Sequence, residues 1–498
     1  MDKELILRSF SRLYSKKYTA YPSSINSVRD SCFFMVKDEE RKYLVVVGEP
    51  DTCKKFEGRP LKELKVGEKK LPIRLAYLTH HNLLLLRQFF PHLSPSPCGR
   101  RTSFGTGDRL GIATPAHIRA FEGKRIFPVL AQQSVREMGR TERDWQKVLD
   151  DAIWGCFEAG YRGPFGADAD HVKRTEDLRE AVDCGYTMFT VDPSDFVRDD
   201  VLRLSEQEKD KLYSSLKERE ELEKLYLGKR YLIAGKSLRF DQKSLKEVVL
   251  IYLKAIRHVV DCYRFLDDYK KGDFDFEVSV DETSTPTSPL AHIFIAQELQ
   301  RNGVNFHNLA LRFTGDWQKG IDYIGDVKKF ADELSLHSAI AKMFGGYKLS
   351  LHSGSDKLSV YPAFSQRTGG LFHIKTAGTS YLQAMRVIAR KEPSLYREVH
   401  RFALERFEKD KASYHVSTDL SRIPDLDSLA DEDLEALFDK PDSRQLIHIT
   451  YGSVLSAKDR YGKFLFRERI YRTLFKNEDE HYKEVSTHIR KHLDLLGV

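Results

Sequence analysis

The chain has 498 residues, and its 41% hydrophobic and 31% charged residues are typical of a folded globular protein, which excludes a disordered chain. Its 81 basic and 74 acidic residues leave a formal net charge of +7 and are largely interleaved, so no basic stripe indicates nucleic acid as a partner. No apolar run is long enough to span a membrane, the first residues lack the apolar core of a secretory signal, and the six cysteines form no CxxC pair. We expect a cytoplasmic protein with no membrane partner.

The first 120 residues predict a separate N-terminal α/β accessory domain. A strand is expected at 43–47, a helix at 79–90, and a proline-rich break at 91–97. A glycine-rich segment, SFGTGDRLG, follows at 103–111. Two interpretations stay open for it: a loop that contacts a ligand, or a turn between domains in which glycine supplies a positive φ.

Eight short apolar runs that end in polar or ionisable residues mark the rest of the chain. The runs are 126–133, 163–171, 186–194, 274–282, 308–316, 347–353, 371–378 and 446–452. Segments with helical periodicity separate most of them, among them 142–157, 175–184, 290–300 and 380–389. This alternation favours a parallel sheet, and eight strands predict an α/β fold, a (β/α)8 TIM-like barrel over residues 121–498. Functional residues are expected at the carboxyl ends of the strands.

A long insertion, about 198–270, is predicted after the third of these strands. Ser205 and Glu208 form a capping box for a charged helix, which we interpret as a solvated or oligomer-contacting arm. A second helix, 244–269, has apolar residues on one face and is expected to pack on the barrel. A homo-oligomer is compatible with this arm.

The second run ends in GADADH, which places Asp168, Asp170 and His171 within four positions. Two carboxylates and an imidazole suit a divalent cation or a general acid/base pair. The alternative is that Asp170 caps the next helix and His171 packs above it.

The fourth run alternates so that Glu277, Ser279 and Asp281 share one face, while Glu282 lies on the other. Because the apolar face should pack against helices, Glu277 is expected to point into the barrel. A buried carboxylate needs a partner or a function, which makes Glu277 a candidate proton shuttle. The alternative is an interior glutamate satisfied by hydroxyl groups and a lysine.

Further candidates lie at the ends of the later runs. His352 is followed by small residues and suits a metal ion. Lys375 is suited to holding a carboxylate, polarising a carbonyl or forming a Schiff base. Arg312 suits bidentate contact with a carboxylate, and Asp316 and Gln318 offer oxygen atoms. His307, at the start of a strand, and His337, inside a predicted helix, are interpreted as packing residues.

Six motifs in order resemble the tagaturonate epimerase family, which interconverts tagaturonate and fructuronate in hexuronate catabolism. They are FGTGDRLGIATPAH, GADADH, SVDETSTPTSP, RFTGDWQKGIDYIGD, KLSLHSGSDK and HIKTAGTSYL. The resemblance extends from about residue 104 to beyond 387. It implies an isomerase that takes a small ketohexuronate, with related ketohexoses such as tagatose and fructose as further substrates to test.

The resemblance also implies a divalent metal cation, with zinc, manganese, cobalt, iron and nickel not distinguished. In this assignment Asp170 is the proton acceptor and Glu277 the proton donor. The implied metal ligands are His171, Gln318 and His352, with Asp316 as the alternative to Gln318. Glu282, the alternative to Glu277, joins Arg312 and Lys375 as predicted substrate-binding residues.

The two sugar acids differ at C4, which is β to the C2 ketone, so simple enolisation does not epimerise it. Retro-aldol cleavage of the C3–C4 bond followed by re-addition, or transient oxidation, would do so. No dinucleotide fingerprint is evident, so we expect no nucleotide cofactor and favour the aldol route, with the metal stabilising the enediolate. A metal-dependent sugar-acid aldolase or isomerase and a non-catalytic sugar-binding barrel remain alternatives.

Overall fold

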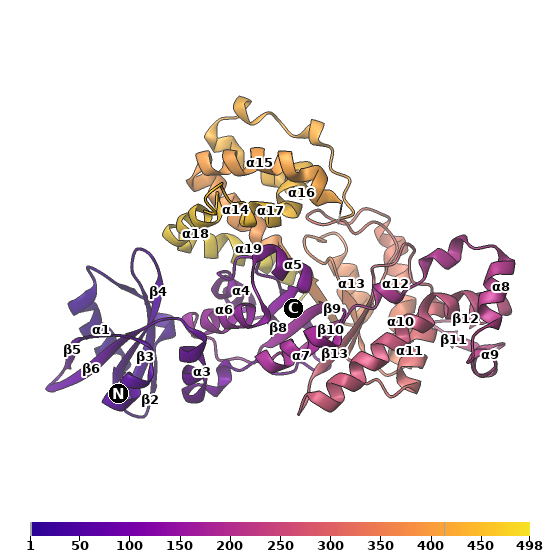
Figure 1. Ribbon diagram of the computed structural model, residues 1–498, viewed down its shortest axis with the longest axis horizontal. Helices are drawn as coiled ribbons and strands as arrows, with labels where there is room; N and C mark the ends of the chain where they lie inside the picture. Colours follow the sequence, from indigo (N-terminus) through magenta and orange to yellow (C-terminus); the bar gives the residue numbers. More distant parts are fainter. Residues whose placement is uncertain (1, 413) are drawn as a thin grey trace.

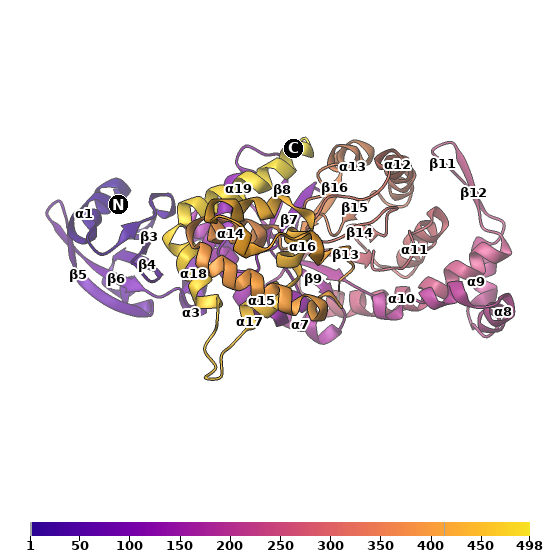
Figure 2. The same cartoon turned by 90° about the horizontal axis from the view of Figure 1, so that it is seen from above.

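The computed structural model describes residues 2–412 and 414–498. An N-terminal sheet, a central barrel and an insertion follow one another along the long axis, and a layer of C-terminal helices covers one side of the barrel (Figure 1). Seen from above, the N-terminal sheet and the insertion lie at opposite ends (Figure 2). Within the described residues, no helix combines the length and the apolar character needed to cross a membrane.

The N-terminal part is an antiparallel sheet with helix α1 (Lys3–Tyr14) packed on it. Its strands are β1 (Thr19–Ala20), β2 (Asn26–Val28), β3 (Ser31–Lys37), β4 (Lys42–Gly48), β5 (Gly58–Val66) and β6 (Lys69–Ala76). Short helix α2 (Pro50–Lys55) follows β4, and α3 (His80–Phe89) leads toward the barrel. Buried Phe10, Phe34 and Val45 belong to one core cluster. The predicted strand at 43–47 and helix at 79–90 are confirmed as β4 and α3.

Eight parallel strands close into a barrel, which confirms the predicted fold class. They are β7 (Ser103–Thr106), β8 (Phe127–Ser134), β9 (Gly166–Val172), β10 (Met188–Val191), β13 (Asp275–Val280), β14 (Asn308–Leu311), β15 (Lys348–Leu351) and β16 (Phe372–Thr376). Pairing of His373 with Ser103 joins the last strand to the first. Seven of the eight predicted runs each contain one of the barrel strands from β8 to β16, except that β8 and β9 extend one residue beyond the carboxyl ends of their runs.

The prediction of a strand at 446–452 is wrong, because this run is helical. It lies in α16 (Pro441–Ile449) and α17 (Tyr451–Ser456), where Leu446, Ile447 and Ile449 are buried. A short apolar run buried on all sides does not distinguish a strand from a helix. The missing strand is β7, inside the glycine-rich segment that we interpreted as a loop or a turn. It falls within the range 1–120 assigned to the accessory domain, yet its hydrogen bonds make it part of the barrel.

Helices cover the outside of the barrel, as the alternation predicts. They are α4 (Thr114–Phe121), α5 (Val135–Thr141), α6 (Trp145–Glu158), α7 (Thr175–Cys184), α10 (Gln242–Tyr269), α11 (Pro289–Arg301), α12 (Val327–Met343), α13 (Tyr361–Thr368) and α14 (Thr379–Lys391). The predicted helix 175–184 matches α7. Gly185, with φ +100°, ends α7 in the left-handed conformation that glycine favours.

The insertion follows the fourth barrel strand rather than the third, because β7 precedes the runs that we counted. It contains α8 (Glu206–Ser214), α9 (Arg219–Tyr226), the hairpin β11 (Arg230–Ile233) and β12 (Lys236–Arg239), and the start of α10. The capping box of Ser205 and Glu208 is confirmed. The charged segment forms two helices instead of one.

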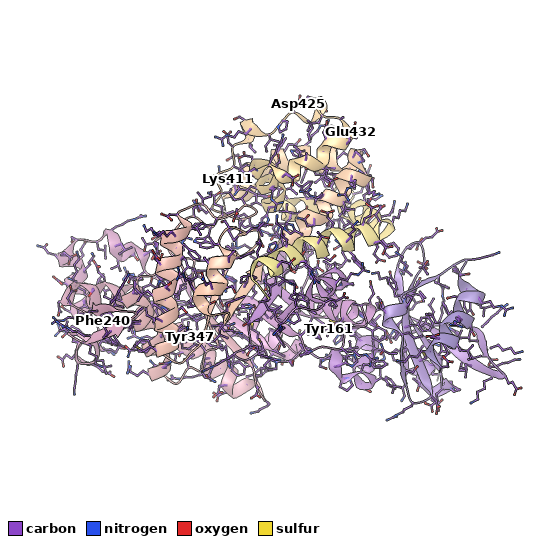
Figure 3. The ribbon with its side chains drawn as sticks, turned by 180° about the vertical axis from the view of Figure 1, so that it is seen from behind. Tyr161, Phe240, Tyr347, Lys411, Asp425 and Glu432 are labelled. Atoms are coloured by element: carbon purple, nitrogen blue, oxygen red, sulfur yellow. The ribbon has the colours of Figure 1, made fainter. Side chains whose placement is uncertain are left out.

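The C-terminal helices form a layer with a core of its own, which the sequence analysis did not predict. Besides α14, α16 and α17, the layer contains α15 (Pro393–Lys411) and α18 (Arg467–Lys476). Helix α19 (Glu478–Leu495) packs against α4 and α14, and its buried Val485 and Ile489 belong to the core of the barrel. Buried Tyr381, Leu395 and Phe438 belong to this core. Figure 3 shows Lys411, Asp425 and Glu432 on this layer, above the barrel that contains Tyr347. The layer therefore faces the end of the barrel where chemistry is expected.

Candidate active site

The carboxyl ends of the barrel strands and the helical layer enclose two adjoining cavities of about 490 Å³ and 470 Å³. We call the cavity of about 490 Å³, which Asp281 and His352 line, the outer compartment of the chamber, and the cavity of about 470 Å³, which Asp170 lines, the inner compartment. Both compartments are lined by Arg136, His171, Glu282, Lys319 and Tyr414. Their size suits a small organic ligand.

Three side chains converge at this chamber: His171 lies near the end of β9, and Asp281 and His352 directly follow β13 and β15. Nitrogen atoms of His171 and His352 and a carboxylate oxygen of Asp281 all lie within 4.8 Å of one another. The two imidazole rings are 4.9 Å apart between centroids. His171 has a left-handed backbone, with φ 53°, which a non-glycine residue adopts at some expense and which is found often at functional sites. The predicted convergence of His171 and His352 is confirmed.

A buried charge cluster lies directly beneath these ligands. Lys375 Nζ is 2.7 Å from Asp168 Oδ2, 2.7 Å from Asp170 Oδ1 and 2.8 Å from Glu277 Oε1. Glu277 Oε1 also lies 2.5 Å from His352 Nε2, and Ser350 donates to Glu277 Oε2 at 2.5 Å. Glu277 is fully buried, at 0% exposure, so it points into the barrel as predicted.

The electrostatics of the cluster are dominated by its carboxylates. Burial opposes ionisation of Asp170, but His171 and Lys375 outweigh burial and hold the pKa of Asp170 well below its usual range. Burial raises the pKa of Asp168 to about 6, although Lys375 acts to lower it. Burial would lower the pKa of His171, yet the adjacent Asp170 carboxylate raises it to about 10. The acidic and basic groups of the cluster thus favour one another's charged forms.

A family model described as tagaturonate epimerase matches residues 21–496. The chain belongs to the tagaturonate epimerase family. The family members compared below are named as epimerases, which confirms the predicted isomerase class.

Known members of the family align with nearly the whole chain. The tagaturonate/fructuronate epimerase of Thermotoga maritima is 51% identical over 492 residues, which cover 99% of this chain and 100% of that protein. The native crystal structure of fructuronate-tagaturonate epimerase UxaE from Cohnella laeviribosi has a TM-score of 0.93 at 41% identity and covers 99% of both chains. The same enzyme with two glycerol molecules gives 0.92 at 41% identity and covers 100% of both.

Asp170 and His171, to which the resemblance assigns the roles of proton acceptor and metal ligand, lie side by side at the chamber. Asp170 lines the inner compartment and accepts a hydrogen bond from His171 Nδ1 at 2.8 Å. The alternative in which Asp170 caps the next helix is wrong, because Arg174 is the N-cap of α7 and no side chain caps it. The alternative for Glu277, satisfaction by hydroxyl groups and a lysine, describes part of its contacts, to which His352 is added.

Gln318 forms hydrogen bonds to the helical layer through its side-chain amide. Its Oε1 accepts hydrogen bonds from Ser417 N at 2.8 Å and from Gln445 Nε2 at 2.9 Å, and its Nε2 donates to Asp316 Oδ2. Gln318 thus ties the loop after β14 to the helical layer. Asp281 is a further carboxylate beside His171 and His352, which the sequence assignment did not name as a ligand.

The predicted substrate-binding residues differ in how exposed they are and in whether they already form ion pairs. Arg312 lines the outer compartment and makes no ion pair with a described residue. Glu282 lies at the rim, where its side chain is 40% exposed and 3.8 Å from Arg136. Lys375 is 4% exposed, and its donors are directed to buried carboxylates. Those carboxylates raise the pKa of Lys375 in spite of burial, which does not suit a Schiff base.

Sequence reasoning did not select Asp281, Lys319, Tyr414 and His448, which line the ligand group or the chamber. A signal existed for Asp281, because the alternation of β13 placed it on the same face as Glu277. Tyr414 and His448 belong to the helical layer and become visible only with the tertiary structure. His307 and His337 were correctly excluded: His307 precedes β14, and buried His337 contacts His292 at 2.9 Å.

A second group of possible ligands lies outside the chamber. Asp356, His488 and His492 meet between the loop after β15 and α19. Here Arg444 Nη2 lies 3.0 Å from Asp356 Oδ2 and already supplies the positive charge. We therefore assign this group to the attachment of the helical layer.

Proposed function

We propose that this chain interconverts D-tagaturonate and D-fructuronate by epimerisation at C4, with the help of a divalent cation. The observation that carries the proposal is the ligand group of His171, Asp281 and His352 beside the buried acid/base cluster. The names of its relatives from Thermotoga maritima and Cohnella laeviribosi support the substrate.

The ligand group fits a divalent cation. Two imidazoles and one carboxylate are common donors for zinc, manganese, iron, cobalt and nickel. Glu277 contacts Nε2 of His352, while Asp281 Oδ1 lies 3.4 Å from its Nδ1, so a carboxylate behind the ring orients it as in many metal sites. A cation held here would supply Lewis acidity to the substrate's ketone oxygen.

The protein's own groups would move the proton of the 4-hydroxyl. Asp170 lines the inner compartment and contacts His171 and Lys375, so we assign it as the group that accepts this proton. Glu277 is fully buried, and we assign it as the second member of the pair, acting through Lys375, whose Nζ contacts both carboxylates. The chamber walls, with Glu282 and Arg312, would contact the substrate's polar groups.

The proposed steps conserve atoms and electrons. Loss of the 4-hydroxyl proton to Asp170 accompanies cleavage of the C3–C4 bond, so that C4 becomes an aldehyde and the bond's electron pair remains on the C1–C3 fragment as an enediolate. The aldehyde turns within the chamber. The enediolate then attacks its other face, the C3–C4 bond re-forms, and the proton returns to the new alkoxide.

Metal content and turnover test this function together. Protein stripped with a chelator and then restored with manganese or zinc would be incubated with D-tagaturonate and followed by NMR. We expect fructuronate only after restoration. His171→Ala should bind less metal and lose activity, whereas His488→Ala, from the second ligand group, should keep its metal. Full activity without metal would refute the proposal, and release of three-carbon products would indicate an aldolase.

Substrate deuterated at C4 separates the two routes to the epimer. Retro-aldol cleavage breaks no C4–H bond, so we expect no primary isotope effect and full retention of deuterium. A primary isotope effect would instead indicate transient oxidation at C4 and refute the aldol route.

A further inference from the structure

We propose that Lys319 binds the substrate's carboxylate and thereby makes the site prefer a uronate to a neutral ketose. The inference rests on the proposed function. It begins from the ion pairs of the cations that line the chamber.

Most cations in the chamber already have acidic partners. Arg109 pairs with Glu137 at 2.8 Å, Lys173 with Asp195 at 2.7 Å, Arg174 with Asp177 at 2.8 Å, and Arg136 with Glu282 at 3.8 Å. Lys319 and Arg312 also line the chamber, and neither lies within 4.0 Å of a carboxylate of any described residue. A buried or half-buried cation without an acidic partner is suited to an anionic ligand.

The position of Lys319 favours it over Arg312. Lys319 lines both compartments, whereas Arg312 lines the outer compartment, which Asp170 does not line. The substrate's C6 is two carbon–carbon bonds from C4, a span of about 2.5 Å. If Asp170 acts at the 4-hydroxyl, the carboxylate must lie close to Asp170. A cation that faces the inner compartment is therefore required.

The contacts of Lys319 prepare it for this role. Its Nζ donates to Ser353 Oγ at 2.6 Å, and Ser353 directly follows the ligand His352. Lys319 retains further N–H donors, and the Ser353 hydroxyl has a proton to offer, so the pair suits the two oxygens of one carboxylate. The backbone carbonyl of Lys319 accepts a hydrogen bond from Gln445 Nε2 at 3.1 Å, which fixes its loop against the helical layer.

Lys319→Met leaves a side chain of similar length but removes the charge. With D-tagaturonate we expect kcat/KM to fall about 10- to 100-fold, mainly through KM, because a charge-assisted contact is lost. With neutral D-tagatose the change should be under about threefold, since no carboxylate is present. Lys319→Arg should restore much of the uronate preference. Lys173→Met, which removes an equal charge that is paired with Asp195, should leave the ratio of the two substrates nearly unchanged.

Calorimetry supplies a readout that does not need turnover. Wild-type protein should bind D-galactonate more tightly than the uncharged galactitol, and Lys319→Met should lose this difference while its melting temperature shows that it is folded. If Lys319→Met keeps the preference, or if Arg312→Met abolishes it instead, the assignment is refuted. If the wild type binds D-galactonate in this way but does not turn over D-tagaturonate, the proposed function fails while the assignment of Lys319 stands.

Discussion

Replacing Lys375 by methionine should destabilise the barrel by leaving Asp168, Asp170 and Glu277 buried without their shared counter-charge. Removing one partner of a buried ion pair costs about 3–5 kcal/mol. At about 2.1 cal/mol/K of unfolding entropy per residue, 498 residues correspond to about 1 kcal/mol/K. We therefore expect the melting temperature to fall by about 3–5 °C near pH 8.

The loss should depend on pH, and its direction follows from the carboxylates. Burial already raises the pKa of Asp168 to about 6 while the lysine is present, and loss of Lys375 removes the charge that opposes this rise. A group with a higher pKa in the folded state contributes stability at low pH that is lost as pH rises through that pKa. The deficit of the variant should therefore be largest at pH 8 and smaller at pH 5.

Thermal melts of wild type and variant at several pH values measure this deficit. Lys348→Met is the matched control, because Lys348 is also buried in the barrel but donates to Ser103 Oγ and to the Arg101 carbonyl, which are neutral. Its deficit should change little with pH. An equal deficit at pH 5 and pH 8 for Lys375→Met would refute the reasoning.

Three further predictions concern the metal ligands and the helical layer. Chelation should lower the melting temperature of the wild type, and His171→Ala should lose most of this response, as measured by scanning fluorimetry. Arg109→Met, which leaves buried Glu137 without its partner, should destabilise the protein by about 3–5 kcal/mol in denaturant unfolding. Gln318→Ala removes the acceptor of Ser417 N–H and should speed hydrogen exchange near residue 417. Exchange at the amino ends of the barrel strands, away from the chamber, should change little.

The barrel was predictable because its strands are apolar runs that end in polar residues. Strand β7 was missed because it has four residues and contains Gly105, which reads as a turn. Residues 446–452 were misread because an apolar run gives the same signal in a buried strand and in a buried helix. The helical layer has amphipathic helices of its own, but nothing in their pattern says that they face the barrel end.

The site was predictable where parallel strands impose proximity. His171 lies near the end of β9 and His352 directly follows β15. The carboxyl ends of these strands must meet at one rim, so topology brings the two residues to the same rim. Gln318 and Asp281 lie on loops at the same rim, and the sequence does not reveal that Ser417 and Gln445 are hydrogen-bond partners of Gln318. Side-chain direction in loops depends on partners that are distant in the chain.

The shared ammonium of Lys375 has a consequence for the evolution of this barrel. Because three acids share one cation, the effect of changing any one of the four residues depends on the other three, and their substitutions should be strongly non-additive. Loss of the lysine should destabilise the protein less if one of the acids is lost at the same time. The four positions are therefore expected to mutate together or not at all.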